Sequence, residues 1–297
     1  MILRELVLDV INDADNVESL KELEGVDGLS GAKLVCLLQR LAGVAATLDE
    51  NSTYLEVGVY QGLTLASVAA TRQLESFGID NFSQFDLDGK NKATVLQRAD
   101  RHSLGNLHLI DEDFETALLN MERFIGERKV GLYFVDGPHD YRSQYLCLDF
   151  ARSILADNCL IVIDDCNYEH VRRANADWLL ANPEYTLVFE AYTDKHPKNM
   201  TASELVAAKK GWWNGVNVLV RDADNEFARR APVTDKSVER FINDHWIHSS
   251  KYAEYAPRLL RAMSISYVVG AAVMFKACFS GGKFKKREKS LNMHFDD

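Results

Sequence analysis

Two hydrophobic periods alternate along the chain and predict short strands that are separated by helices. Between residues 54 and 163, apolar runs rich in β-branched and aromatic side chains alternate with longer segments whose apolar residues recur every three or four positions. The predicted strands are 54–59, 76–80, 107–110, 130–135 and 160–163, and the predicted helices are 63–73, 90–102, 115–124, 141–155 and 171–180. Such alternation is typical of a parallel sheet, because a right-handed crossover returns the chain to the same edge. We therefore predict an α/β fold with a mostly parallel sheet and helices on both faces.

Further elements are predicted on either side of this region. Residues 30–48 have apolar side chains at helical spacing, and Ser30 is placed to cap this helix. Two strand-like runs follow at 185–192 and 215–221, and the polar stretch between them is long enough to be a functional loop. From residue 235 onward the pattern again predicts helices.

The composition is that of a globular chain with an acidic main part and a basic end. Of the 297 residues, 47% are hydrophobic and 26% are charged, which excludes a disordered or low-complexity chain. Residues 1–221 carry 21 basic and 34 acidic side chains, whereas residues 222–297 carry 13 and 10. The net charge of −10 repels phosphate backbones, so nucleic acid is not an expected partner. We divide the chain into a helical segment at 1–50, a main domain at 51–221 and a helical extension with a basic tail at 222–297.

Cysteine usage and hydropathy favour a cytoplasmic protein. The five cysteines are widely spaced and include no CxxC pair, which argues against a disulfide framework or a zinc cluster. The N-terminal residues lack the apolar stretch of a signal peptide. The longest apolar run, 265–275, is shorter than the roughly 20 residues that span a bilayer. With the basic cluster at 283–289 it could lie on an anionic membrane surface, and the alternative is a core helix with a solvated basic end.

The residues of chemical interest directly follow the predicted strands. In an open parallel sheet, ligands bind beyond the carboxyl ends of the strands. The first strand runs into the sequence EVGVYQGLT, which contains Glu56, Gly58, Gly62 and Thr64. Glycine at position 58 allows a ligand to approach the backbone, and the helix after Gly62 offers free N–H groups to a carboxylate. The alternative is that the two glycines are ordinary turn residues.

An acidic residue also ends the second predicted strand. Asp80 is placed to accept hydrogen bonds from both hydroxyls of a ribose, as acidic residues at this position do in nucleotide-binding folds. Asp86 and Asp88 are the alternatives if the strand is instead 81–85.

The third predicted strand is followed by Asp113 and Phe114. Asp113 could accept from an adenine amino group, and Phe114 could pack against the ring. The alternative for Asp113 is a role as N-cap of the helix at 115–124.

The fourth and fifth predicted strands both lead into acidic clusters. The sequence VDGPHDY carries Asp136 and His139, and the sequence IDDCN carries Asp164 and Asp165. Both strands are fully apolar, so unpaired carboxylates at their ends are costly unless a cation lies between them. Asp136, Asp164 and Asp165 form an oxygen-rich set that suits Mg²⁺. Histidine can take up a proton near neutral pH, which makes His139 a candidate general base. The alternative is that one aspartate caps a helix and another pairs with an arginine.

Taken together, these segments resemble the class I S-adenosylmethionine-dependent methyltransferases over about residues 50–221. The matching motifs are E-V-G-V-Y-Q-G from Glu56 to Gly62, G-I-D-N-F around Asp80, V-D-G-P-H-D-Y at 135–141 and I-D-D at 163–165. Within that superfamily, the last two motifs look like those of the methyltransferase family 24 group and the macrocin-type sugar O-methyltransferases.

The resemblance implies a fold, a cofactor and roles for the motif residues. The implied fold is a Rossmann-like sheet of seven strands, closed by an antiparallel pair at 185–192 and 215–221. The implied cofactor is S-adenosyl-L-methionine, and the residues implied to bind it are Glu56, Gly58, Gly62, Thr64, Asp80, Asp113, Phe114 and Asp136. Mg²⁺ is implied on Asp136, Asp164 and Asp165. The implied catalytic residues are His139 and Asp136, with His139 taking the proton of the acceptor hydroxyl.

The function that follows is O-methylation of a small hydroxylated acceptor, such as a sugar or glycan precursor. Two alternatives remain. One is a metal-dependent hydrolase built on Asp136, His139, Asp164 and Asp165. The other is a non-catalytic, methyltransferase-like subunit that binds a partner through residues 222–297. A homo-oligomer is also compatible with the sequence.

Overall fold

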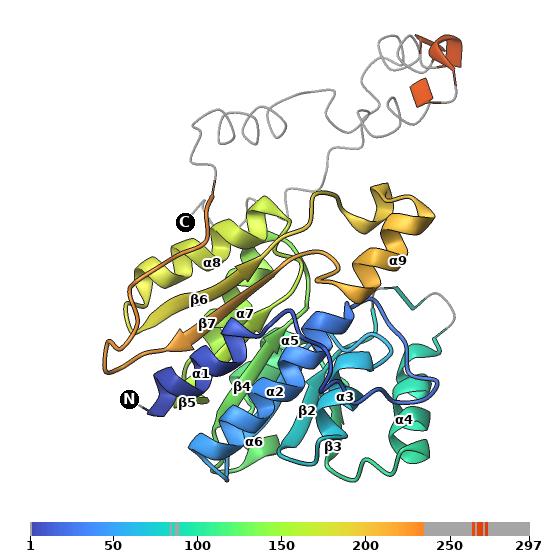
Figure 1. The fold of residues 1–297 in the computed structure, drawn as a ribbon. Helices are drawn as coiled ribbons and strands as arrows, with labels where there is room; N and C mark the ends of the chain where they lie inside the picture. Colours follow the sequence, from blue (N-terminus) through green and yellow to red (C-terminus); the bar gives the residue numbers. More distant parts are fainter. Residues whose placement is uncertain are drawn as a thin grey trace, which may run out of the picture. The chain divides into compact units, whose positions relative to one another are not determined.

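The strands form one sheet of seven, in the order β3-β2-β1-β4-β5-β7-β6 (Figure 1). The computed structural model describes residues 2–83, 85–86, 89–234, 263–264, 266–269 and 271–272. The strands are β1 (Thr53–Val57), β2 (Glu75–Ile79), β3 (Leu107–Ile110), β4 (Val130–Val135), β5 (Leu155–Ile163), β6 (Tyr185–Ala191) and β7 (Val216–Arg221). The first five pair in parallel, and β7 is antiparallel to both β5 and β6. The predicted Rossmann-like, mostly parallel sheet is confirmed, including the antiparallel pair at its end.

Helices pack on both faces of this sheet, as predicted. One face is covered by α1 (Ile2–Asn12), α2 (Ala32–Leu48), α3 (Leu63–Ala69) and α4 (Asn91–Arg101), and the other by α5 (Phe114–Leu119), α6 (Glu122–Ile125), α7 (Tyr141–Ala151) and α8 (Glu169–Ala181). Alternate residues of β4 face the two layers: Leu132 and Phe134 join the first core, and Tyr133 and Val135 join the second. Burial of each such side chain contributes roughly 1.5–3 kcal/mol. The central strands are therefore held from both sides, which fixes where their carboxyl ends lie.

The start of α2 differs from the prediction. The helix begins at Ala32 and its N-cap is Gly31, which provides no side-chain cap. Instead, the backbone N–H of Lys33 donates to the carbonyl of Gly211 at 3.3 Å. A Cβ at Gly31 would lie 2.1 Å from that carbonyl oxygen, so only glycine lets the Gly211 backbone come this close. The Gly211 carbonyl thus accepts from the start of α2 in place of the Ser30 side chain.

Two further element boundaries differ for local and non-local reasons. The helix predicted at 115–124 is two short helices, because the Asn120 side chain donates to the Thr116 carbonyl and Asn120 ends α5 in a non-helical conformation. The helix predicted at 141–155 ends at Ala151, and β5 begins at Leu155 because this residue pairs with Val130 of β4. Both errors leave the carboxyl ends of β3, β4 and β5 where they were predicted. In contrast, β1 ends at Val57 and not at residue 59, and α3 ends at Ala69 and not at residue 73.

The polar stretch between β6 and β7 is more ordered than a loop. It contains a short 3₁₀ helix (Pro197–Asn199) and α9 (Ala202–Lys210). A capping box begins α9, in which the Thr201 hydroxyl accepts from the backbone of Glu204 and the Glu204 carboxylate accepts from the backbone of Thr201. Trp212 then packs into the core beside α1 and α2.

The first compact unit ends at Thr234, and a second unit comprises the residues from Asp235 onward. Residues after β7 follow the edge strand β6: the Leu187 N–H donates to the Arg230 carbonyl at 3.1 Å.

In the second unit, residues 263–264, 267–269 and 271–272 are helical. The basic cluster at 283–289 and most of the apolar run at 265–275 lie outside the described residues. No helix in the described part of the chain is long and apolar enough to cross a membrane.

Candidate active site

Glu56 lies beneath the turn that follows β1, where no solvent reaches it. Its carboxylate accepts from the Tyr54 hydroxyl at 2.6 Å and from the Thr64 hydroxyl at 2.8 Å. Burial raises the pKa of Glu56 to about 8, although both hydrogen bonds act in the opposite direction. Glu56 and Thr64 therefore bind each other and hold the turn on the first residues of α3.

This raised pKa predicts a dependence of stability on pH. A carboxyl group whose pKa is higher in the folded chain than in the unfolded chain binds more protons when the chain is folded. Its contribution to the free energy of unfolding is therefore fully present below the pKa that Glu56 has in the unfolded chain, and it is lost as the pH rises toward about 8. We expect the wild-type protein to lose about 2 kcal/mol of unfolding free energy relative to Glu56→Gln between about pH 6 and about pH 8.5. Urea unfolding of both proteins at the two pH values measures the difference. A difference that does not change with pH would contradict the assignment.

The two glycines of this turn lie where other parts of the chain leave little or no room for a side chain. Gly58 has a φ of +91°, and a Cβ there would lie 1.9 Å from the carbonyl oxygen of Asp136. Gly62, with a φ of +80°, is the N-cap of α3, and a Cβ there would lie 3.2 Å from the Val95 side chain. The absence of a side chain at Gly58 thus allows the ends of β1 and β4 to meet.

Asp80 directly follows β2, one residue beyond the strand that was predicted to end with it, and its carboxylate organises the same turn. One oxygen accepts from the backbone N–H groups of Val59 and Tyr60 at 2.9 and 2.8 Å, and the other accepts from Phe82 at 2.7 Å. Its rival Asp86 instead accepts from the backbone of Lys90, the N-cap of α4. Asp88 lies outside the described residues.

Asp113 is the N-cap of α5. Its carboxylate accepts from the Glu115 N–H at 2.9 Å, which is the alternative role considered for it. Phe114 is partly buried against the core under α5 to α8. Both residues follow β3, which is separated from β4 in the sheet by β2 and β1.

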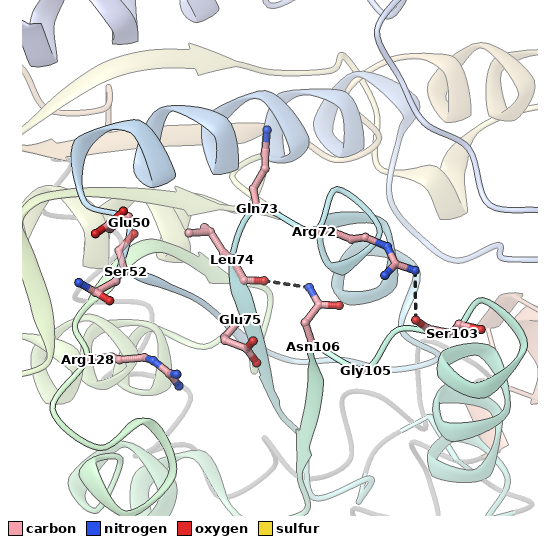
Figure 2. A pocket seen from close by; sticks show the side chains of 11 residues that line it. Glu50, Ser52, Arg72, Gln73, Leu74, Glu75, Ser103, Gly105, Asn106 and Arg128 are labelled. Atoms are coloured by element: carbon pink, nitrogen blue, oxygen red, sulfur yellow. Dashed lines mark hydrogen bonds between the residues drawn. The ribbon is translucent and has the colours of Figure 1, made fainter.

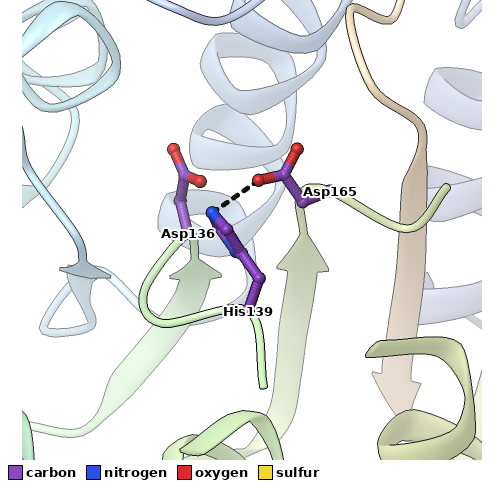
Figure 3. A group of neighbouring side chains, drawn as sticks. All are labelled: Asp136, His139 and Asp165. Atoms are coloured by element: carbon purple, nitrogen blue, oxygen red, sulfur yellow. Dashed lines mark ion pairs between the residues drawn. The ribbon is translucent and has the colours of Figure 1, made fainter. Parts of the chain in front are cut away.

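The carboxyl ends of β4 and β5 bring three predicted residues together. Figure 3 shows Asp136 after β4, Asp165 after β5 and His139 between them. His139 Nε2 lies 2.6 Å from Asp165 Oδ2, and one ligand atom from each of the three residues lies within 4.8 Å of the other two. Asp165 adopts the left-handed conformation, with a φ of +57°. Asp164 is buried next to this group, but its Oδ1 accepts from the backbone N–H of Asp165 at 2.8 Å.

The electrostatics of this group fit a hard cation. Burial, followed by the negative charges of Asp164 and Asp165, raises the pKa of Asp136 well above its usual range. Burial and the adjacent Asp165 do the same for Asp164. Burial also acts to raise the pKa of Asp165, but His139 and Asn214 outweigh it and leave that pKa below its ordinary value. Two converging carboxylates are ligands that a divalent ion accepts. The residues present therefore fit a metal ion on Asp136 and Asp165, and His139, which is bonded to Asp165, lies beside them.

Aromatic and amide residues that sequence reasoning did not assign to the site surround it. The Tyr168 ring stacks on those of His139 and His170, with centroids 5.8 and 5.3 Å apart, and its hydroxyl lies 2.7 Å from His196 Nε2. Asn214 donates to Asp165. The signal for Tyr168 was its place three residues after Asp165. Asn214 has no comparable local signal.

Two cavities lie at the opposite edge of the sheet. One, of about 480 Å³, is lined by residues at the starts of β1, β2 and β3, including Ser52, Glu75 and Asn106, with Arg72 and Arg128 at its sides (Figure 2). The other, of about 420 Å³, lies at the start of β6 beside Tyr185. Both are remote from the carboxyl ends of the parallel strands.

Comparisons with known proteins agree with the motif analysis. Residues 55–166 match the model of a family described as a methyltransferase domain, and this range contains every residue predicted to bind the donor or a metal. No curated protein matches the chain. The match confirms, for residues 55–166, the resemblance to methyltransferases.

Several solved structures are similar in fold. An O-methyltransferase from Bacillus cereus in complex with SAH is 15% identical, and the alignment covers 74% of this chain and 90% of the other with a TM-score of 0.47. The O-methyltransferase TomG from Streptomyces achromogenes is 14% identical, with 72% and 90% covered and a TM-score of 0.47. CalS11, a TDP-rhamnose 3'-O-methyltransferase, is 14% identical, with 75% and 94% covered and a TM-score of 0.49.

Proposed function

We propose that this chain, whose residues 55–166 form a methyltransferase domain, is an S-adenosylmethionine-dependent O-methyltransferase that acts on a small hydroxylated acceptor with the help of Mg²⁺. The observation that carries the proposal is the convergence of Asp136, His139 and Asp165 at the carboxyl edge, next to the turn formed by Gly58 and Asp80. The sheet order reverses between β1 and β4, and ligands of open α/β sheets bind at such a point.

The donor is expected to bind over the turn between β1 and α3. Because the Glu56 carboxylate is buried and bonded to Tyr54 and Thr64, the backbone of the turn is the surface that contacts the donor's methionine end. Asp80 holds that backbone and stands at the end of the neighbouring strand, where it can reach the ribose hydroxyls. The adenine is expected to bind near Asp113, the N-cap of α5.

The acceptor side is expected to lie over Asp136 and Asp165. A divalent ion held there by Asp136 and Asp165, with Asp164 behind them, would supply positive charge that lowers the pKa of the acceptor hydroxyl. In the neutral imidazole of His139, Nε2–H donates to Asp165, which leaves Nδ1 as the nitrogen that can accept the hydroxyl proton. The acceptor oxygen then bonds to the methyl carbon as the carbon–sulfur bond breaks, and positioning supplies most of the acceleration.

The acceptor class belongs to the same proposal. The motifs resemble those of sugar O-methyltransferases, so we expect a sugar or glycan precursor. The metal-dependent hydrolase is not favoured, because residues 55–166 match a methyltransferase domain and hydrolysis has no use for the donor turn.

Loss of the Asp80 carboxylate tests the donor site. We expect Asp80→Ala to weaken binding of S-adenosylmethionine about 10- to 100-fold, because three backbone N–H groups lose their charged acceptor and the ribose hydroxyls lose theirs. Isothermal titration calorimetry measures the affinity. Asp86→Ala is the matched control, since it removes a nearby aspartate whose carboxylate, among the described residues, accepts from the start of α4. Equal affinities of Asp80→Ala and wild type, or an equal loss in Asp86→Ala, would contradict the donor site.

A further inference from the structure

Asn214 is a buried residue directly before β7, and its side chain reaches the candidate active site. It is 1% exposed, and its Nδ2 donates to Oδ1 of Asp165. The two residues are 49 positions apart in the sequence. The other carboxylate oxygen of Asp165 faces His139 Nε2 at 2.6 Å. Each oxygen of Asp165 therefore has its own partner, and the two partners fix the rotation of the carboxylate.

The backbone around Asn214 is joined to the loop that carries Asp165. The Asn214 carbonyl accepts from Asn167 at 2.9 Å, and the Gly215 carbonyl accepts from Cys166 at 3.1 Å. These two backbone hydrogen bonds already attach the loop to β7. The hydrogen bond from the Asn214 side chain is separate from these backbone bonds, because its acceptor is the Asp165 carboxylate itself.

The orientation of the Asn214 side-chain amide leaves one of its own polar atoms unsatisfied. Its Oδ1 is buried and has no hydrogen-bond partner within the described part of the chain. An unsatisfied buried oxygen is costly. The opposite orientation of the amide would place this oxygen against the Asp165 carboxylate, so the donor is the group that the site requires.

We propose that Asn214 is a positioning residue, which fixes the Asp165 carboxylate for both His139 and a divalent ion. The inference rests on the proposed function, in which Asp165 serves both groups. Without the Asn214 donor, one oxygen of Asp165 loses its partner and the carboxylate can rotate away from His139. Loss of a partner that orients a metal ligand in this way typically weakens metal affinity about 10- to 100-fold.

The test compares Asn214→Leu and Asn214→Ala with Asn182→Ala in the full-length protein. Leucine keeps the volume of the side chain, and alanine leaves a cavity. Asn182 is a matched control because it is also buried, donates to the Trp178 carbonyl at 2.8 Å and has an Oδ1 without a partner among the described residues. It lies just before the start of β6, at the opposite edge. Two readouts are taken: the affinity for Mn²⁺ alone by electron paramagnetic resonance, and the nitrogen chemical shifts of the His139 imidazole in metal-free protein.

We expect both Asn214 variants to bind Mn²⁺ about 10- to 100-fold more weakly than wild type and to change the His139 nitrogen shifts. Asn182→Ala should change neither. The affinity for S-adenosylhomocysteine should be the same in all four proteins, which shows that the fold is intact. Unchanged Mn²⁺ affinity and unchanged His139 shifts in a folded Asn214 variant would overturn the inference. The inference also fails if neither Asn214 variant folds while Asn182→Ala does, because Asn214 would then be structural.

The two readouts separate this inference from the proposed function. If wild type binds no Mn²⁺ but the Asn214 variants still alter the His139 shifts, the metal part of the proposed function fails and the positioning of Asp165 stands. If wild type binds Mn²⁺ and the variants match it in both readouts, the metal site stands and the inference about Asn214 fails.

Discussion

Alanine at position 58 is expected to lower the free energy of unfolding by about 4 kcal/mol and to prevent donor binding. The φ of Gly58 is +91°, a conformation that costs an L-residue energy, and the added Cβ would lie 1.9 Å from the Asp136 carbonyl oxygen and 2.5 Å from its carbonyl carbon. Both contacts are with backbone, so no side chain can move aside. The ends of β1 and β4 would have to separate, and the turn over which the donor is expected to bind would move with them.

Gly126→Ala provides the matched control for this prediction. Gly126 also has a positive φ, +64°, but nothing lies within 4 Å of the Cβ that alanine would add. Alanine at position 126 should therefore cost only the conformational part, about 1–3 kcal/mol. Urea unfolding measures both changes, and calorimetry with S-adenosylhomocysteine measures donor binding. Similar losses of stability in the two variants, or normal donor affinity in Gly58→Ala, would show that the close approach to Asp136 is not what position 58 requires.

The sheet and its functional edge were predictable from local sequence. The bounds of β3 and β4 agree with the predicted strands residue for residue, because their apolar runs end abruptly at polar residues. Asp136 and Asp164 were placed correctly after their strands for the same reason, and Asp80, predicted as the last residue of its strand, is the residue directly after it. Parallel strands share one carboxyl edge, so the meeting of Asp136, His139 and Asp165 followed from the alternation of strands and helices.

Other features depended on residues distant in sequence. The cap of α2 is a carbonyl of Gly211, and the start of β5 is set by pairing with Val130. Neither partner can be recognised from the local pattern. Asn214 is a further case, because an asparagine before a strand is ordinary until the fold places it against Asp165. The need for glycine at position 58 was predictable, but its cause was not: the chain's own Asp136 backbone, and not a ligand, makes the close approach.

Replacement of His139 by glutamine is expected to reduce methyl transfer about 10²- to 10⁴-fold, the usual contribution of a general base. The glutamine amide can still donate to Asp165, as His139 Nε2 does at 2.6 Å, but it has no nitrogen that accepts a proton at neutral pH. Positioning of Asp165 should therefore survive while proton removal is lost. Transfer of label from methyl-labelled S-adenosylmethionine to a panel of nucleotide sugars and catechols measures turnover, and calorimetry should show unchanged affinity for the donor.

His170→Gln separates loss of the base from loss of ring stacking. The His170 ring also stacks on Tyr168, with centroids 5.3 Å apart, but the side chain is exposed and is not one of the three residues that converge with Asp165. It should retain turnover within a few-fold of wild type, since the proton acceptor is untouched. Equal losses in His139→Gln and His170→Gln would assign the effect to packing around Tyr168. Full turnover in His139→Gln would remove His139 from the reaction and leave proton removal to another group.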